Sequence, residues 1–388
     1  MNMIDYLKWR GDIDMKTDPF NEVDNMLIAQ MTYVDMDEIF AAHKSLTIKE
    51  ISDLYFSSHD LEEAFNQTSY FFMSPMVMYL MAQTERFKDL RVYNYVSTLD
   101  PESAEQFAAE MVDLPDKTTV ICFEGTDDTI IGWKEDLMLS YTEIPSQKKA
   151  ADYLDHCTNP FRKYRVIGHS KGGHLALYAA THCKESVRKR IVEVISNDGP
   201  GMRPGSYDEE VFESIQDRYR LIVPEKDGVG TIYEMGKNRK IVLSSNANLV
   251  SSHSMMTWEV ERNALQEADR NNYETELNRQ SLLRFLNETT PEQREVFVKE
   301  LFDRFEEAGV TTVTQLSNLG LSFIPKALKK FGEMNEESRQ LAGQLIKTYS
   351  GKLGSDAYHT ISDKAGNLVP KRRPRKEKEE DIEEEEGE

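Results

Sequence analysis

Residues 165–174 read Arg-Val-Ile-Gly-His-Ser-Lys-Gly-Gly-His, and they contain a G-x-S-x-G pattern centred on Ser170. An apolar pair precedes the pattern, and a run rich in leucine and alanine follows it. A buried strand, a sharp turn and a helix in this order are typical of a nucleophile elbow. Such a turn holds the serine in a strained backbone conformation, so that its hydroxyl protrudes above the sheet. We therefore predict Ser170 as a nucleophile.

The elbow also requires small residues around the serine. The turn brings the positions two before and two after it close together, and Gly168 and Gly172 occupy them. Gly173 lets the following helix lie close to the strand. The spacing of the glycines thus supports the elbow beyond the bare pattern.

Composition and charge exclude several classes of function. The 388 residues are 39% hydrophobic, which is enough for one large domain with appendages or for two domains. The net charge is −21, and most of it belongs to the body, because segment 371–388 holds 6 basic and 9 acidic residues. Nucleic-acid binding needs a basic face, so it is not expected. Strong attraction to an anionic membrane surface is disfavoured for the same reason.

The chain carries no sign of a cofactor, a disulfide framework or an export signal. Its three cysteines are too few and too scattered for disulfides or a zinc site. Phosphate-loop and H-E-x-x-H motifs are absent, so we expect no metal or organic cofactor. The start of the chain lacks the layout of a signal peptide. The longest apolar stretch, near 70–82, is too short to span a bilayer and predicts a core helix from Ser74-Pro75, or part of a cap over the substrate. We expect a cytoplasmic protein without a transmembrane segment.

The order of elements indicates an α/β fold with a mostly parallel central sheet flanked by helices. Asp18-Pro19 predicts the start of an amphipathic helix near the N-terminus. A β-type run follows at 118–123, and three more come after the elbow, at 191–195, 219–223 and 240–243. Strands that alternate with helical segments favour parallel pairing.

The chain beyond about residue 275 has a different character. Thr290 and Gln293 form a capping box that predicts a helix ending before Gly309, and more helical stretches follow near 312–331 and 335–349. We divide the chain into a hydrolase domain (1–275), a helical C-terminal region (276–365) and a disordered charged tail (366–388). The tail is either a solvated segment or a site for a protein partner.

A serine hydroxyl is a weak nucleophile until a neutral imidazole takes its proton, and an acid orients that imidazole. In α/β-hydrolases the chain order is serine, acid, histidine. His253 follows the run 240–243 and is the only histidine between His182 and His359. Asp227 follows the run 219–223, where the acid is expected. Two alternatives stay open: Asp198, one strand earlier, and Glu225.

Two backbone N–H groups are candidates for the oxyanion hole. One belongs to Lys171, at the start of the helix after the serine. The other comes from the loop after 118–123, at Thr126, whose hydroxyl is a further candidate donor. We interpret the side chains of His169 and Lys171 as packing or charge-modulating groups, because an elbow points the neighbours of the serine away from the reaction.

These motifs together resemble the class 3 lipase-type α/β-hydrolases and, more closely, the bacterial Mbeg1-like proteins, also called the DUF2974 family. The resemblance covers roughly residues 18–265. It is carried by Phe20-Asn21-Glu22-Val23-Asp24, Gly125-Thr126-Asp127-Asp128-Thr129, Gly132-Trp133-Lys134-Glu135-Asp136, Gly168-His169-Ser170-Lys171-Gly172-Gly173, Asp198-Gly199-Pro200-Gly201, and His253 with Trp258.

The resemblance implies an α/β-hydrolase fold with a nucleophile at Ser170 and a histidine at His253. Two departures from the family pattern stand out. The position of Asp227 is often not acidic in the family, which leaves a serine–histidine dyad or another acid open. Glu124 replaces a common arginine, and it could pair with Lys171 or Lys134 or face solvent.

Two functions follow from the sequence. The first is a lipase- or esterase-like serine hydrolase that cleaves an ester, thioester or lipid acyl bond of a small-molecule or lipid substrate through an acyl-enzyme on Ser170. The second is a non-catalytic binding module on a hydrolase scaffold, which recruits a protein partner through its C-terminal region.

Overall fold

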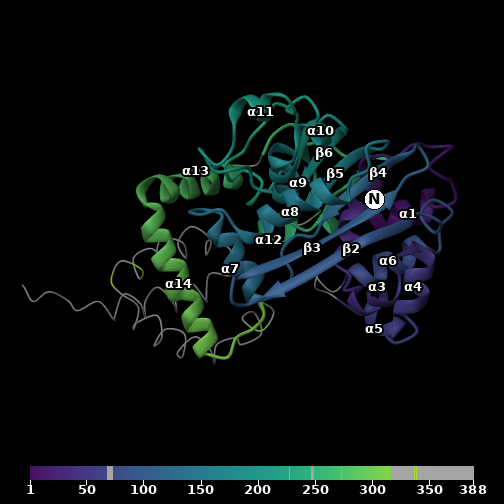
Figure 1. The fold of residues 1–388 in the computed structure, drawn as a ribbon, viewed down its shortest axis with the longest axis horizontal. Helices are drawn as coiled ribbons and strands as arrows, with labels where there is room; N and C mark the ends of the chain where they lie inside the picture. Colours follow the sequence, from purple (N-terminus) through teal and green to yellow (C-terminus); the bar gives the residue numbers. More distant parts are fainter. Residues whose placement is uncertain are drawn as a thin grey trace, which may run out of the picture.

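The computed structural model describes residues 1–67, 73–226, 228–245, 249–271 and 273–313, together with 315, 336 and 338. A central sheet crosses the molecule (Figure 1). In the described residues it has eight strands, which lie in sequence order. Neighbours from β4 to β8 are parallel, and those from β1 to β4 are antiparallel. The strands are β1 (Ser45–Thr47), β2 (Arg91–Asp100), β3 (Glu105–Asp113), β4 (Thr118–Phe123), β5 (Lys163–His169), β6 (Ile191–Asn197), β7 (Tyr219–Pro224) and β8 (Arg239–Val242).

This sheet confirms the predicted α/β class and the four runs read from the sequence, which form β4, β6, β7 and β8. The antiparallel extension β1–β3 was not predicted.

Alternate side chains of the parallel strands build two hydrophobic cores. Val166 and Val194 face α8 (Pro145–Cys157) and α9 (Lys171–His182), whereas Ile167 and Ile195 face the core around α2 (Glu22–Met31). Burial on both faces explains why apolar residues stand next to one another in β5 and β6, at 166–167 and 194–195.

Six helices form the N-terminal part of the described chain: α1 (Met3–Arg10), α2, α3 (Asp37–Ala42), α4 (Ile48–Tyr55), α5 (Leu61–Phe65) and α6 (Ser74–Ala82). The predicted helix at Ser74-Pro75 is confirmed as α6. The predicted helix start at Asp18-Pro19 is wrong, because Asn21 caps α2 and Asp18 pairs with Arg10 at 2.9 Å. The predicted amphipathic character is wrong too, since all residues of α2 after Glu22 are buried.

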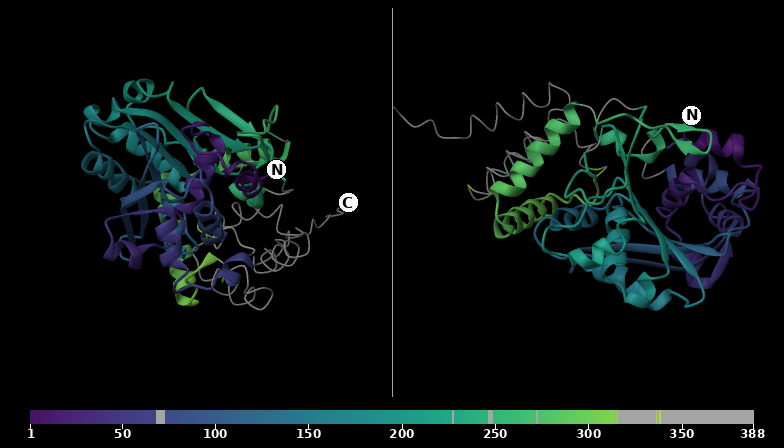
Figure 2. Two further views of the ribbon diagram at one scale, coloured as in Figure 1. Left: turned by 90° about the vertical axis from the view of Figure 1, so that its right-hand side faces the viewer. Right: turned by 90° about the horizontal axis from the view of Figure 1, so that it is seen from above.

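Helices α13 (Tyr273–Glu288) and α14 (Pro291–Glu307) lie at the opposite end of the sheet from the N-terminal helices (Figure 2). The capping box of Thr290 and Gln293 is confirmed, and Gly309 follows the helix with a φ of 71°. Helix α14 packs on α7 (Ile130–Met138), where Trp133 stacks on Phe305 with ring centroids 6.0 Å apart. The remaining elements are α10 (Glu185–Arg188), α11 (Glu209–Glu213), α12 (Leu249–Ser252), the 3-10 helix Met255–Thr257, and the hairpin of β9 (Val260–Glu261) and β10 (Ala264–Leu265).

The proposed division into 1–275, 276–365 and 366–388 stays a prediction. Its first boundary falls in the first turn of α13, which begins at Tyr273. The stretches expected to be helical near 312–331 and 335–349 lie largely outside the described residues, and the tail 366–388 lies wholly outside them. Within the described part of the chain, no helix has the length and apolar character needed to cross a membrane.

A buried acid lies in the middle of β3. Glu110 has no exposed surface, and one of its carboxylate oxygens accepts a hydrogen bond from the Thr32 hydroxyl at 3.1 Å. Its other oxygen has no hydrogen-bond partner among the described residues. Burial raises the pKa of the Glu110 carboxyl to about 8, because the charged form loses its hydration.

We expect Glu110 to make the protein less stable as the pH rises. The unfolded chain releases this proton near pH 4.5, whereas the folded chain keeps it until about pH 8. Between these values the free energy of unfolding should fall by up to about 1.4 kcal/mol per pH unit. Glu110→Gln should remove this slope while it keeps an acceptor for Thr32. Urea unfolding from pH 5 to pH 8 measures the difference, and Glu102→Gln, at an exposed turn, controls for the lost charge. Equal slopes in wild type and Glu110→Gln would contradict the prediction.

Candidate active site

Ser170 lies at the sharp turn between β5 and α9, as the elbow pattern predicts. Its backbone has φ 57° and ψ −126°, a strained conformation for a residue with a side chain. The glycines around it are required by close packing. A Cβ atom at Gly168 would lie 2.2 Å from the Gly172 carbonyl carbon, and one at Gly172 would lie 2.1 Å from the Phe123 carbonyl oxygen.

The ring of His253 meets the carboxylate of Asp198. The His253 Nδ1 atom lies 2.6 Å from Asp198 Oδ2, and Asp198 is fully buried. Because a carboxylate accepts, Nδ1 carries the proton, and this leaves Nε2 as the acceptor that a general base needs. Asp198 is thus the acid that the structure places against the histidine.

Asp198 is held in position from both sides. It follows β6 with a φ of 52°, and its second carboxylate oxygen accepts the Gly230 N–H at 2.9 Å. The residue before it, Asn197, accepts the Ser170 N–H through its carbonyl at 2.9 Å. The acid and the serine therefore stand on neighbouring strand ends.

Two other acids were candidates from the sequence. Asp227, the acid preferred from the sequence, lies outside the described residues. Glu225 accepts hydrogen bonds from Asn271 and Thr275 through its backbone carbonyl.

The loop that carries His253 is anchored at two points. Trp258 is fully buried, and its indole N–H donates to the Ser252 carbonyl at 2.9 Å. On the other side, His169 Nε2 lies 2.8 Å from the His253 carbonyl oxygen, and the two histidine rings have centroids 4.6 Å apart. His253 is therefore held next to the residue that precedes Ser170. Within the described residues, the Ser170 hydroxyl makes no hydrogen bond. Hydrogen bonds between a nucleophile and a base are often long or poorly aligned until a substrate is bound.

The two predicted oxyanion donors are available. Among the described residues, neither the Lys171 nor the Thr126 backbone N–H has a hydrogen-bond acceptor. The Thr126 hydroxyl lies 2.5 Å from Asp136 Oδ2 and donates to it. Burial raises the pKa of the Asp136 carboxyl to about 6, although the Lys171 charge opposes this rise. When Asp136 is ionised, the Thr126 hydroxyl proton is used in the hydrogen bond to this carboxylate. Thr126 can then donate to an oxyanion only through its backbone N–H.

We call residues 124–129, between β4 and α7, the oxyanion loop. The Lys171 side chain ties the elbow to β3 and to α7, which follows this loop. Its ammonium is buried, lies 2.8 Å from Glu135 Oε2, and donates to the Gln106 carbonyl at 2.7 Å. Glu124 accepts a hydrogen bond from the Gln106 side chain at 2.9 Å, rather than forming the ion pair with Lys171 or Lys134 that we considered. Burial, reinforced by Asp127, raises the pKa of the Glu124 carboxyl. Sequence analysis missed Glu135 and Gln106, because nothing in their spacing marks them as neighbours of the elbow.

The C-terminal region contacts the oxyanion loop directly. Thr129 and Thr312 form an antiparallel bridge, with the Val313 N–H donating to the Asp128 carbonyl at 2.8 Å. The Thr129 hydroxyl caps α7 by accepting from the Gly132 N–H. The loop is thus held both by α7 and by the segment at Thr312 and Val313.

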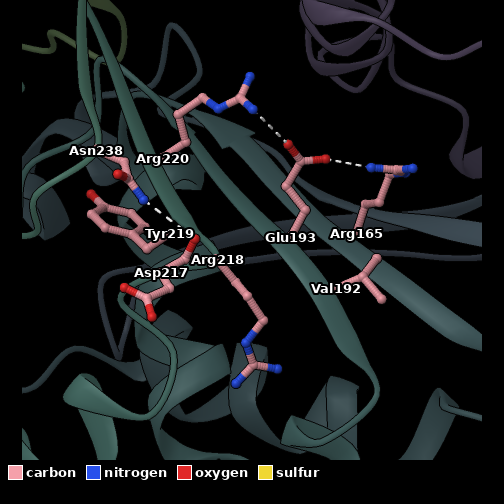
Figure 3. Close-up of a pocket in the computed structure, with 8 residues that line it drawn as sticks. All are labelled: Arg165, Val192, Glu193, Asp217, Arg218, Tyr219, Arg220 and Asn238. Atoms are coloured by element: carbon pink, nitrogen blue, oxygen red, sulfur yellow. Dashed lines mark hydrogen bonds and ion pairs between the residues drawn. The ribbon is translucent and has the colours of Figure 1, made fainter.

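A charged cavity of about 550 Å³ lies at the other edge of the sheet (Figure 3). Glu193 points between Arg165 and Arg220 and pairs with both. These residues stand near the amino ends of β5, β6 and β7, whereas Ser170 follows the carboxyl end of β5. In α/β sheets ligands bind beyond the carboxyl ends of the strands, so this cavity is separate from the candidate site.

In the described part of the chain, no three His, Cys, Asp or Glu side chains are grouped to hold a metal.

Three comparisons with known proteins show what the chain is similar to. The model of the Mbeg1-like family matches residues 81–303, which is more than half of the chain. A fungal lipase in complex with an inhibitor matches with 16% identity and a TM-score of 0.35, covering 63% of this chain and 80% of the lipase. M37 lipase matches with 17% identity and a TM-score of 0.34, covering 55% of this chain and 70% of the lipase. A search of curated proteins gives no match. The elbow, the strand order and the family match lead to one conclusion: this chain belongs to the Mbeg1-like family and has an α/β-hydrolase fold.

Proposed function

We propose that this protein is a serine hydrolase that cleaves an ester, thioester or lipid acyl bond through an acyl-enzyme on Ser170. The observation that carries the proposal is the Asp198–His253 pair, held beside a serine in an elbow conformation. A protein that only binds a partner has no need for a buried acid that fixes the tautomer of a histidine at this position.

The residues have distinct roles in the proposed reaction. Ser170 Oγ attacks the acyl carbonyl carbon while His253 Nε2 takes the hydroxyl proton. Asp198 stabilises the imidazolium that forms. The Lys171 and Thr126 N–H groups donate to the oxyanion of the tetrahedral intermediate. His253 then returns the proton to the leaving group, and a water molecule, activated by the same ring, releases the acid from Ser170.

A fluorophosphonate probe tests the proposal, because it reacts with an activated serine hydroxyl. We expect labelling of the full chain at one site, with the adduct mapped to Ser170 by peptide mass spectrometry. His253→Ala should abolish labelling, whereas His182→Ala, a histidine far along α9, should not. Absence of labelling on Ser170, or equal labelling of wild type and His253→Ala, would refute the proposal.

A further inference from the structure

His169 is a fully buried histidine with both ring nitrogens engaged. Its Nδ1 atom lies 2.8 Å from the Tyr33 hydroxyl, and its Nε2 atom lies 2.8 Å from the His253 carbonyl oxygen. The second contact joins residues 84 positions apart in the chain. His169 therefore bridges the turn that carries the nucleophile and the loop that carries the candidate base.

The protonation state of the His169 ring follows from its partners. A carbonyl oxygen can only accept, so Nε2 must carry a proton. Burial and the nearby His253 hold the pKa of His169 well below its usual range, so the ring is neutral. Nδ1 is then an acceptor, and the Tyr33 hydroxyl donates to it. The ring of His169 thus has one fixed tautomer and is not arranged to take a proton from Ser170.

Tyr33 extends this connection to the oxyanion loop. A Cβ atom at Gly125 would lie 2.0 Å from the Tyr33 hydroxyl oxygen, so tyrosine and loop are in close contact. Gly125 directly precedes Thr126, the proposed donor to the oxyanion. Tyr33 and His169 therefore lie between the backbone that supplies the oxyanion donor and the backbone that supplies the base.

We infer that His169 is a positioning residue, which uses its Nε2–H to hold the backbone of His253 so that the His253 ring faces Ser170. The inference rests on the proposed function of the same site. Asp198 restrains the ring of His253 at Nδ1, but it does not fix the backbone from which the ring extends. Without the His169 bond, the ring could turn about its contact with Asp198 and lose its alignment with the serine. A displacement of about 1 Å in a catalytic group costs roughly 10²-fold in rate.

Three substitutions separate positioning from packing. His169→Phe fills the volume but removes the donor, and we expect kcat for a short-chain p-nitrophenyl ester to fall roughly 10²-fold with KM changed less than about threefold. His169→Gln places an amide N–H near the position of Nε2 and should recover most of that loss. His169→Asn carries the same amide on a side chain too short to reach the His253 carbonyl, and it should behave like His169→Phe. Tyr33→Phe keeps the donor to His253 and should cost less than His169→Phe.

The matched control is His182→Phe, which makes the same replacement in a histidine that stacks on Tyr178 farther along α9. Melting temperatures accompany each rate. Full activity of His169→Phe would overturn the inference, as would equal losses in His169→Gln and His169→Asn. Should His169→Phe fail to fold, the Gln and Asn variants carry the test by themselves. Labelling of the wild-type protein on Ser170 tests the proposed function separately. If the wild type is labelled and His169→Phe keeps full activity, only the inference on His169 is wrong.

Discussion

Replacement of Ser170 by alanine is expected to lower kcat for ester hydrolysis on the order of 10⁶-fold, because no other group takes over the nucleophilic attack. The stability of the fold should stay nearly unchanged. Among the described residues, the Ser170 hydroxyl makes no hydrogen bond, so its removal leaves no partner unsatisfied. Turnover of a p-nitrophenyl ester and thermal unfolding of the same preparations measure the two effects.

A second variant checks the elbow itself. Ser170 has a φ of 57°, which costs a residue with a side chain about 1–3 kcal/mol. Ser170→Gly should relieve this strain and, after the larger entropy loss of glycine, unfold with a free energy about 1 kcal/mol above that of Ser170→Ala. Ser140→Ala, two residues beyond α7, is the comparison for a serine whose hydroxyl does make a hydrogen bond, since it donates to the Leu137 carbonyl at 2.7 Å. Retained turnover in Ser170→Ala would disprove the acyl-enzyme, and equal stability of the two variants would disprove the strain.

The second large effect is expected for Asp198→Asn, with a loss in kcat of roughly 10⁴-fold. Asparagine has the same shape and tolerates the φ of 52° at this position. The Gly230 N–H requires an acceptor, so the amide oxygen should face Gly230 and the amide NH₂ should face His253. The NH₂ group donates to Nδ1, which moves the ring proton to Nε2. His253 then cannot accept the proton of Ser170.

Asp227→Asn is the matched comparison, because Asp227 is the acid preferred from the sequence. If Asp198 orients His253, Asp227→Asn should keep most of the activity. The loss in Asp198→Asn should be partly relieved at high pH, where hydroxide can take the proton of the Ser170 hydroxyl in place of His253. Activity lost in Asp227→Asn but retained in Asp198→Asn would reverse the assignment. Rates of fluorophosphonate labelling from pH 6 to pH 10 give the same comparison without a substrate.

The sequence predicted those features that local chemistry controls. The glycines around Ser170 indicated the elbow because a Cβ atom at either Gly168 or Gly172 would collide with backbone. The apolar runs predicted β4, β6, β7 and β8 because strands with core on both faces are rich in apolar residues, although Glu193 and Arg220 interrupt two of the runs. The capping box at Thr290 predicted α14 because it satisfies N–H groups within one turn.

Local signals failed where neighbours distant in sequence decide the outcome. Asp18-Pro19 has the residue types of a helix start, yet Asp18 pairs with Arg10, and Asn21 caps the helix instead. Strand β3 was missed since its centre holds Glu110, a residue that sequence reasoning assigns to the surface. Its partner is Thr32, the residue that follows α2, 78 residues away in the chain.

By itself, the sequence predicted the elbow at Ser170, the histidine candidate and the α/β class, because each rests on spacing within a few residues or on the order of elements. Only the tertiary structure distinguished Asp198 as the carboxylate against His253, and only it placed His169, Gln106 and Glu135 around the elbow. Several acids follow the carboxyl ends of strands in this chain. Parallel pairing from β4 to β8 brings these strand ends to one edge of the sheet, so it does not distinguish among the acids. The choice among them depends on the backbone turn at Asp198 and on the path of the loop that returns His253 to β5. Both involve contacts between segments far apart in the sequence, from Gly230 to Asp198 and from His169 to His253.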